Sequence, residues 1–297
     1  MGRAGRPARL AVGVVSAGRV GAVLGAAWTA AGHRVIATSG VSRASVNRAA
    51  ALLPDVPLRA PDDVVTRCDL ALLAVPDDVL PGLVRGLAAA GCFRPGQIVV
   101  HTCGALGVAV LAPAVEHGVL PLALHPVMTF TGRTEDVARL AGCSVGMTAV
   151  AGDEAGWSVG EALVVEMGAE PVRIPEEVRP LYHAALAHGA NHLVTLIRDC
   201  VEALEQAGVR PAERLIAPLL SAALDNALRH GDRALTGPVA RGDAATVRTH
   251  LRELDAVNPD LGQTYRVLAG RTARRAAQAG LLPAHGAHAV LTILEQR

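Results

Sequence analysis

The chain has 297 residues, enough to bury a substantial core and, at the usual domain size, to form two domains. A net charge of +1, with arginine as the only strongly basic residue type, and only two Trp, two Tyr and two Phe argue against a nucleic-acid partner. No apolar run reaches the roughly 18–20 residues of a membrane span, no signal peptide is recognised, and five scattered cysteines without a C-x-x-C pair indicate the reducing cytoplasm.

Short apolar runs alternate with helical patterns through the first half of the chain. This alternation predicts a doubly wound α/β fold with right-handed crossovers, in which parallel strands are buried on both faces. We assign residues 1–175 to this domain. The expected strands are residues 10–15, 33–38, 69–76, 97–102, 118–126, 143–150 and 169–175.

The β pattern stops after Pro175, so residues 176–297 are expected to form an all-helical domain. Asp243 and Asp260 are expected to cap the third and fourth helices, and Gly280 to end the fourth. The expected helices are residues 177–206, 211–230, 243–256, 260–279 and 284–296.

A glycine-containing turn follows the first strand in "VGVVSAGRVG" (12–21). A dinucleotide fingerprint has three glycines, for a tight turn, for approach to the pyrophosphate and for helix packing. Ser16 takes the first place, and Gly18 and Gly21 take the others. The pattern predicts a nucleotide phosphate site, although such turns also join strands to helices without a ligand. Its expected residues are Ser16, Ala17, Gly18, Arg19 and Val20.

The end of the second strand indicates which nucleotide is bound. An NAD enzyme usually has an acidic residue there, but "ATSGVSRAS" has none between Ala37 and Ser45. Ser42 and Arg43 instead offer a hydroxyl and a guanidinium to a 2′-phosphate. We therefore expect NADP (as NADPH), the alternative being that Arg43 is a solvated residue at the start of a helix.

With these motifs in view, the chain resembles Rossmann-like proteins that carry a C-terminal helical domain of unknown function. They belong with ketopantoate reductase, pyrroline-5-carboxylate reductase and the 6-phosphogluconate and β-hydroxyacid dehydrogenases. The resemblance implies a nicotinamide cofactor, a small carbonyl or imine substrate, and a homodimer formed through the helical domain. It rests on "GVVSAGRVG", "LLAVPDD" (72–78), "HTCGALG" (101–107), "LHPVMTF" (124–130), "YHAALAHGANHL" (182–193) and "LTGPVARGD" (235–243).

Two departures from the family pattern affect the expected chemistry. Ser16 and Cys103 stand where glycine and serine are more usual. The β-hydroxyacid dehydrogenases carry K-x-x-x-N, whose lysine donates a proton to the substrate oxygen. Aligning that asparagine with Asn191 puts Ala187 at the lysine position, and this chain has no lysine at all. The usual proton donor is therefore missing.

The helix at 181–200 supplies the first candidates for chemistry. Its periodicity turns His183 toward the apolar face and puts Asn191 at the edge of that face. His183 is a candidate general acid and Asn191 a candidate for orienting the substrate, the alternative for both being ordinary packing. His188 and His192 have the i,i+4 spacing of a metal pair. They lack a nearby third ligand, so we expect no metal.

Further candidates follow the carboxyl ends of the strands, where open α/β sheets bind ligands. Val75, Pro76 and Thr102 are expected beside the cofactor. Cys103 is expected at the substrate, as an inert thiol because no basic residue adjoins it. His125 is a second candidate acid. Arg241 is a candidate clamp for a substrate carboxylate, unless it is a solvated residue beside Asp243.

The sequence thus predicts an NADPH-dependent reductase of a small 2-oxo acid, with ketopantoate as the leading substrate. An imine reductase of the pyrroline-5-carboxylate reductase type is the first alternative, because a protonated imine already carries its proton. A non-catalytic NADP-binding protein is the second.

Overall fold

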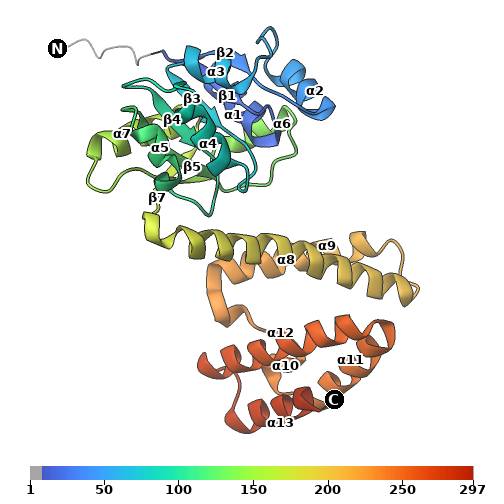
Figure 1. Ribbon diagram of the computed structural model, residues 1–297. Helices are drawn as coiled ribbons and strands as arrows, with labels where there is room; N and C mark the ends of the chain where they lie inside the picture. The colour runs from blue at the N-terminus through green and yellow to red at the C-terminus, as the bar shows by residue number, and fades with distance from the viewer. Residues whose placement is uncertain (1–8, 297) are drawn as a thin grey trace, which may run out of the picture. The chain divides into compact units, whose positions relative to one another are not determined.

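The structure, a computed structural model, describes residues 9–296 (Figure 1). The sequence predicts that the N-terminal segment is not a signal peptide. Residues 1–8 of that segment lie outside the residues that the structure describes. The chain divides into two compact units, one ending at His188 and the other beginning at Gly189. This division falls inside helix α8 (Arg179–Gln206), whereas the domain boundary expected at residue 175 precedes that helix.

The first unit contains a seven-stranded sheet in the order β2-β1-β3-β4-β5-β6-β7. All neighbouring strands are parallel except β5 and β6, which are antiparallel. The connection between these two strands holds only α6 (Glu135–Leu140). The chain does not cross back along the sheet in this connection, so it enters β6 at the same edge at which it leaves β5. The strands are β1 (Ala11–Val15), β2 (Arg34–Thr38), β3 (Leu70–Leu73), β4 (Ile98–His101), β5 (Leu120–Pro126), β6 (Ser144–Thr148) and β7 (Glu170–Arg173).

Helices cover both faces of the sheet, which confirms the predicted doubly wound α/β class. Alternate residues of β3 show why: Leu70 and Leu72 join the core on one face, and Ala71 and Leu73 join the core on the other. One face carries α1 (Arg19–Ala30), α2 (Arg43–Leu52), α6 and α7 (Glu154–Glu166). The other carries α3 (Pro61–Arg67), α4 (Leu80–Ala89), the 3₁₀ turn η1 (Val108–Leu111) and α5 (Ala112–Val115).

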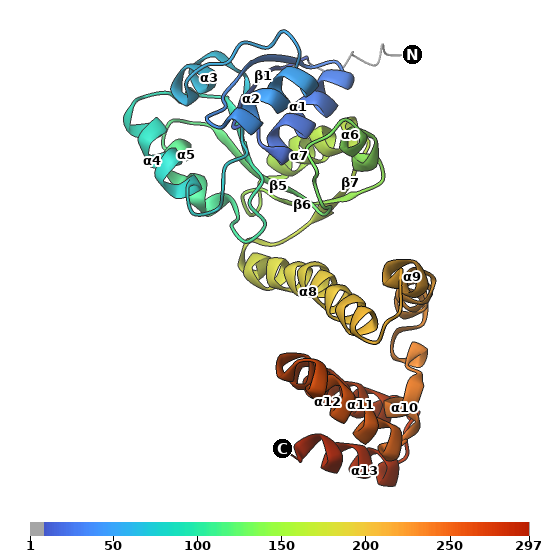
Figure 2. The ribbon, with the colours of Figure 1, turned by 90° about the vertical axis from the view of Figure 1, so that its right-hand side faces the viewer.

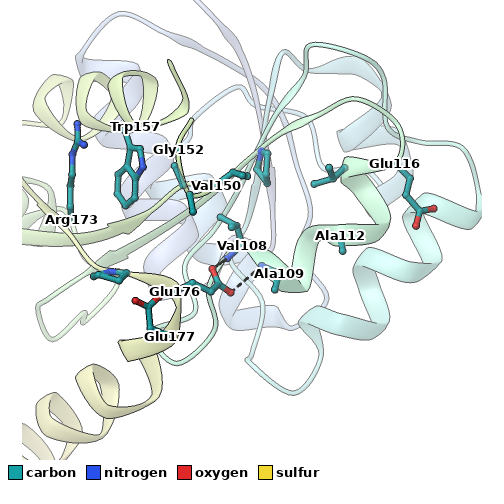
Figure 3. Close-up of a pocket in the computed structure, with 15 residues that line it drawn as sticks. Val108, Ala109, Ala112, Glu116, Val150, Gly152, Trp157, Arg173, Glu176 and Glu177 are labelled. Carbon is teal, nitrogen blue, oxygen red and sulfur yellow. Dashed lines mark hydrogen bonds between the residues drawn. The ribbon is translucent and has the colours of Figure 1, made fainter. Parts of the chain in front are cut away.

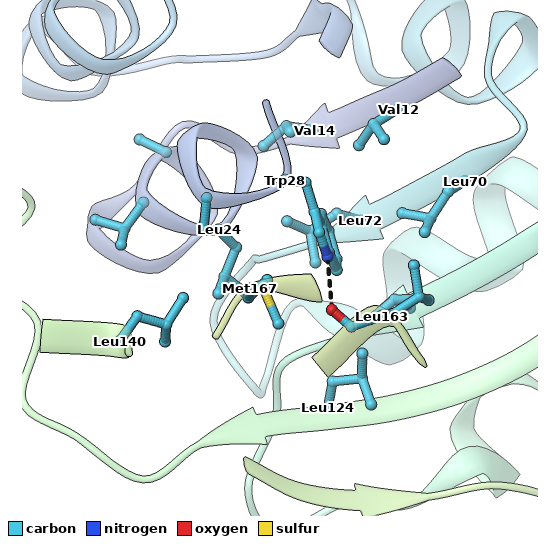
Figure 4. Packing of buried hydrophobic residues seen from close by; sticks show 14 of the residues in the cluster. Val12, Val14, Leu24, Trp28, Leu70, Leu72, Leu124, Leu140, Leu163 and Met167 are labelled. Atoms are coloured by element: carbon cyan, nitrogen blue, oxygen red, sulfur yellow. Dashed lines mark hydrogen bonds between the residues drawn. The ribbon is translucent and has the colours of Figure 1, made fainter. Parts of the chain in front are cut away.

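Trp28 is the largest fully buried side chain of the first core (Figure 4). It packs among apolar residues of the sheet and of α7, and its indole N–H donates to the backbone oxygen of Leu163 at 3.1 Å. A buried indole needs such an acceptor. The bond ties α1 to α7 across a sequence separation of 135 residues.

The second unit contains only helices among its described residues (Figure 2). The Asp243 carboxylate accepts from the Thr246 N–H and caps α11, as expected. The cap expected at Asp260 is wrong: Asn258 caps α12, and its side chain accepts from the Asp260 N–H. Besides the end of α8, the unit comprises α9 (Ala212–His230), the turn η3 (Gly231–Ala234), α10 (Gly237–Arg241), α11 (Ala244–Val257), α12 (Pro259–Gln278) and α13 (Ala284–Glu295).

No helix within residues 9–296 has the length and apolar character that crossing a membrane requires. Gly280 has a φ of +72° and follows α12 directly after its C-cap, Ala279, as the sequence predicts.

Candidate functional site

The turn after β1 is built around one strained residue and one close approach. Ser16 has a φ of +76°, a conformation that favours glycine, and its N–H donates to the Ser39 hydroxyl at 2.8 Å. Gly21 allows α1 to pack directly on this turn, because a Cβ there would clash with the backbone oxygen of Ser16. Both the first fingerprint position, Ser16, and the third, Gly21, therefore have a geometry that favours glycine. Only the third is a glycine.

The amino end of α1 is open toward the loop that precedes it. Gly18 is the N-cap residue and no side chain caps the helix. A Cβ on Gly18 would meet only the Ser16 hydroxyl at 3.5 Å and the Ala74 oxygen at 3.9 Å. The first-turn N–H groups, beginning at Arg19, have no acceptor within the helix, and the helix dipole places positive potential there. This end of α1 fits a phosphate group.

Ser16→Gly is expected to stabilise the protein by about 1 kcal/mol, because glycine removes the cost of a positive φ. Asp55→Gly is the matched comparison, since Asp55 is the other non-glycine residue with positive φ among those described (φ 65°). Its gain should be smaller because Asp tolerates this conformation better. Urea unfolding measures both. A loss of stability in Ser16→Gly would show that the serine side chain makes a compensating contact.

The end of β2 leads into a capped helix. The Ser42 hydroxyl accepts from the Ser45 N–H at 3.1 Å in a capping box, so this hydroxyl already serves α2. Arg43 follows it and is exposed. Arg48, which the sequence analysis did not select, packs beside Gly132 together with Arg19. The edge formed by α1 and α2 therefore presents three arginines.

The loop after β4 is fixed by a buried histidine. His101 is fully buried, and its Nε2 lies 2.9 Å from the Gly107 oxygen. Its Nδ1 accepts from the Cys103 N–H at 3.2 Å, so Nε2 carries the proton and donates to Gly107. Thr102 is half-buried in this loop and Cys103 is buried.

Burial is also the main cause of an unreactive thiol in this loop. It raises the pKa of the Cys103 thiol to about 11, and the neighbouring Asp77 carboxylate adds to the effect. Asp77 lies in the loop after β3, next to the predicted residues Val75, half-buried, and Pro76, exposed. Asp77 belongs to the motif "LLAVPDD", but nothing in the sequence alone predicts a role for it.

Three polar side chains meet near the carboxyl end of β5. His125 Nδ1 lies 2.9 Å from the Tyr182 hydroxyl. The rings of His125 and His183 are edge to face with centroids 5.7 Å apart. A Cβ on Gly104 would lie 2.5 Å from His183 and 2.9 Å from His125, so only glycine allows these rings to reach the loop. The structure thus brings together His125, His183 and the loop of Cys103. We call His125, Tyr182 and His183 the His–Tyr cluster.

His125 of the His–Tyr cluster is neutral. Burial, with help from nearby His183 and Arg179, lowers the pKa of His125 to about 4. Burial also raises the pKa of Tyr182 above its usual value. At neutral pH the cluster therefore offers a neutral imidazole hydrogen-bonded to a protonated phenol. Sequence analysis did not select Tyr182, although it begins one of the quoted motifs.

Arg179, at the start of α8, holds the cluster's helix to the sheet. Its side chain is completely buried and has no carboxylate hydrogen-bond partner among the contacts described. Burial lowers its pKa. The guanidinium donates to the Thr148 hydroxyl and to the backbone oxygens of Cys103, Gly104, Ala123 and Gly146, at 2.7–3.3 Å.

Acid is expected to destabilise the first unit. Burial, partly offset by the Gly107 bond, lowers the pKa of His101 to about 4, and His125 is lowered similarly. Between pH 6.5 and 4 the unfolded chain binds protons that these histidines refuse in the folded state, so the unfolding free energy falls with pH. Each contributes on the order of 3 kcal/mol.

Urea unfolding at a series of pH values tests this dependence. His101→Gln should flatten the slope between pH 6.5 and 4 while lowering stability at pH 7. The exposed His230→Gln should leave the slope unchanged. An unaltered slope in His101→Gln would remove His101 as a cause.

The remaining predicted residues belong to the second unit. Asn191 lies on α8 and Arg241 at the end of α10; both are exposed and remain predictions. His192 is likewise exposed in this unit, and His188 is exposed at the end of the first. Within residues 9–296 no group of three or more His, Cys, Asp or Glu residues is arranged to hold a metal ion.

Comparisons with known proteins agree with this architecture. Residues 2–126 match a Rossmann-like domain, and residues 146–272 match the domain of unknown function DUF2520. No curated protein sequence matches the chain.

Solved structures share the fold at low sequence identity. A candidate NADP oxidoreductase from Bacteroides fragilis is 18% identical, with a TM-score of 0.74 over 89% of this chain and 98% of its own. An imine reductase from Myxococcus stipitatus in complex with NADP⁺ is 19% identical, with a TM-score of 0.64 over 96% and 100%. A pyrroline-5-carboxylate reductase from Coxiella burnetii is 14% identical, with a TM-score of 0.56 over 93% and 100%. The chain is therefore similar to a Rossmann-like domain in its first part and to DUF2520 in a segment that begins within β6 and ends within α12.

Proposed function

We propose that the protein is an NADPH-dependent oxidoreductase that reduces a small C=N substrate. The observation that carries the proposal is the occurrence, in one unit, of an uncapped helix end beside the Ser16–Gly21 turn and of a neutral His125 within hydrogen-bond distance of Tyr182. The structural relatives named as NADP oxidoreductase, imine reductase and pyrroline-5-carboxylate reductase support it.

The residues of the first turn fit the pyrophosphate of a dinucleotide. The N–H groups at the start of α1 would bind its oxygens, with Ser16, Ala17, Gly18, Arg19 and Val20 around them. Bound NADPH supplies the hydride. Arg43 would pair with the 2′-phosphate, and Arg48 adds positive charge to the same edge. Val75, Pro76 and Thr102 would border the cofactor.

The cluster favours a C=N over a C=O substrate. Reduction of a ketone leaves an alkoxide that needs a proton, and an imidazole with a pKa of about 4 is almost entirely unprotonated at pH 7. The chain also lacks a lysine. A protonated imine brings its own proton, so His125 and Tyr182 need only to orient it. His183 and Cys103 are proposed to line the substrate, and Asn191 remains a candidate that the sequence alone suggests.

A 2-oxo acid, with ketopantoate foremost, is the second candidate. The observation in its favour is the Tyr182 hydroxyl, which is a neutral donor held by His125 and suited to an alkoxide. In that reaction the Tyr182 hydroxyl would donate its proton to the alkoxide, and a proton from solvent would restore the phenol. Arg241, for the substrate carboxylate, and His183, for proton supply, remain candidates that the sequence suggests.

The helical unit is proposed to form a homodimer. Its helix α9 exposes Leu215, Leu219, Leu224 and Leu228, each more than half accessible. At 100° per residue, Leu215 and Leu219 lie on one side of α9, and Leu224 and Leu228 lie on the opposite side. Exposed leucines on both sides of one helix normally become buried in an interface. Sedimentation analysis should give twice the monomer mass of 30.5 kDa, and Leu219→Glu with Leu228→Glu should give the monomer.

Two measurements test the function. NADPH titration, followed by nicotinamide fluorescence and thermal stabilisation, should show binding, with NADH binding more weakly. Loss of nicotinamide absorbance should then be faster with a cyclic imine such as 1-pyrroline than with ketopantoate. Faster reaction with ketopantoate would favour the oxo-acid reductase. Binding without turnover of either substrate would favour a non-catalytic NADP-binding protein, and absence of binding would end the proposal.

A further inference from the structure

A cavity of about 820 Å³ lies in the first unit and is lined by residues between 108 and 177, which do not include the Ser16–Gly21 turn. Figure 3 shows these lining residues. Pro121 at the start of β5 lines it, whereas His125 of the His–Tyr cluster lies four residues later on the same strand, about 13 Å further along. The volume is in the range of small-molecule sites. Its walls include Val108, Ala112, Val115, Pro121, Ala149 and Val150.

The charged residues of the cavity are mostly acidic. Three carboxylates line the cavity, those of Glu116, Glu176 and Glu177, together with one guanidinium, that of Arg173. The lining therefore has a formal excess of two negative charges. Arg173 is already paired: it donates to Glu161 at 2.8 Å and to Glu154 at 3.3 Å. Its guanidinium carbon also lies 4.9 Å from the centre of the Trp157 ring, beside which Figure 3 shows it. The guanidinium therefore does not neutralise the other carboxylates.

We propose that this cavity binds an organic ammonium ion with an apolar body, such as an alkyl or cycloalkyl amine. The apolar walls would cover the body, and the carboxylates of Glu116 and Glu177, which are exposed at the rim, would attract the ammonium group. A neutral ligand of the same shape would gain only the apolar contacts, and an anion would be repelled.

Glu176 connects this cavity to the His–Tyr cluster. Its carboxylate accepts from the Val108 N–H at 2.7 Å and from the Ala109 N–H at 3.1 Å, and it packs on Gly107. Gly107 in turn receives the His101 bond that fixes the loop after β4. An ammonium ion that attracts the Glu176 carboxylate would therefore weaken its hydrogen bonds to Val108 and Ala109. Those bonds hold the loop after β4, which His125 and His183 contact. This regulatory role rests on the proposed function, whereas the binding itself does not.

Binding is tested without cofactor, using cyclohexylammonium as the probe and cyclohexanol and cyclohexanecarboxylate as its neutral and anionic counterparts. Trp157 lines the cavity, and the only other tryptophan, Trp28, is fully buried, so tryptophan emission reports occupancy. We expect saturable binding of cyclohexylammonium, weaker binding of cyclohexanol and none of the carboxylate. Trp157→Phe should lose the optical signal while calorimetry still detects heat.

Paired variants decide whether the carboxylates matter. Glu116→Gln combined with Glu177→Gln should weaken cyclohexylammonium about tenfold, since exposed ion pairs contribute modestly. Glu170→Gln, an exposed acid outside the cavity lining, should change nothing. Circular dichroism verifies that each variant is folded. Equal affinity in the double variant, or equal binding of cyclohexanol, would overturn the proposal.

The regulatory role has its own readout. Cyclohexylammonium should change kcat/KM of the wild type, and the double variant should lose this response at the same amine concentration. If the amine binds the cavity but kcat/KM is unchanged, the regulatory role is overturned and the binding site stands. If no substrate is turned over, the failure lies with the proposed function and the binding result is unaffected.

Discussion

Gly21→Ala is expected to abolish high-affinity NADPH binding and to destabilise the protein. The added methyl group would clash with the backbone oxygen of Ser16 and lie 2.9 Å from the Ala74 side chain. A backbone oxygen cannot rotate away, so the turn or α1 must shift. Overpacking of this kind costs about 1–3 kcal/mol. Because the turn and the start of α1 would hold the same phosphates, affinity should fall by more than about tenfold.

Two further alanine variants separate the causes. Gly18→Ala meets no close neighbour in the protein, so it should keep stability while weakening NADPH, whose phosphates would need that space. Gly86→Ala, inside α4 with nothing within 4 Å, should gain about 1 kcal/mol and leave affinity unchanged. Fluorescence titration and urea unfolding measure the two quantities. Unchanged NADPH affinity in both Gly18→Ala and Gly21→Ala would place the cofactor elsewhere.

The elements of the fold were predictable because their signals are local. Strand and helix bounds agree with the expected ranges to within about three residues, since apolar runs and turn residues mark them directly. The antiparallel pairing of β5 and β6 was not predicted, because it depends on how a long connection folds. The Asp260 cap was wrong because Asn258, two residues earlier, also satisfies the capping preference.

The residues of the candidate site were also predictable only where the sequence carries a local signal. His125 and His183 were named from the sequence, and the structure brings their rings together. Tyr182 was missed because aromatic residues on an apolar helix usually pack in a core. His101 and Arg179 were missed for a different reason: their burial depends on the meeting of strands distant in the sequence. An "Arg-Pro" pair at a helix start gives no local sign that the arginine is buried.

Glycines adjacent to the site carried a signal that sequence reasoning did not use. Gly104 and Gly146 are required by the side chains packed on them, His183 and Tyr182 respectively. Neither has the positive φ that often explains glycine. Each is a position where a neighbour's ring comes close to the backbone, which a single sequence does not distinguish from a turn.

Arg179→Met is expected to cost 3 kcal/mol or more, on the order of the loss seen when a buried polar network is broken. Methionine fills part of the volume but leaves four backbone oxygens and the Thr148 hydroxyl without the guanidinium that binds them. Water cannot replace it easily, because the side chain is completely buried. Arg179→Lys should be intermediate, since an ammonium group has three donors and cannot span the same acceptors.

Arg179 is also expected to affect kcat, which a residue that only stabilises the fold would not do. Its bonds to the Cys103 and Gly104 oxygens fix the loop on which His183 packs, so Arg179→Lys should lower kcat at a temperature where it is fully folded. NADPH affinity should be nearly unchanged, because the turn after β1 makes none of these bonds. The exposed Arg229→Met should alter neither quantity, since its pair with Asp225 lies in solvent. Wild-type kcat in folded Arg179→Lys would mean that the loop keeps its geometry without the guanidinium.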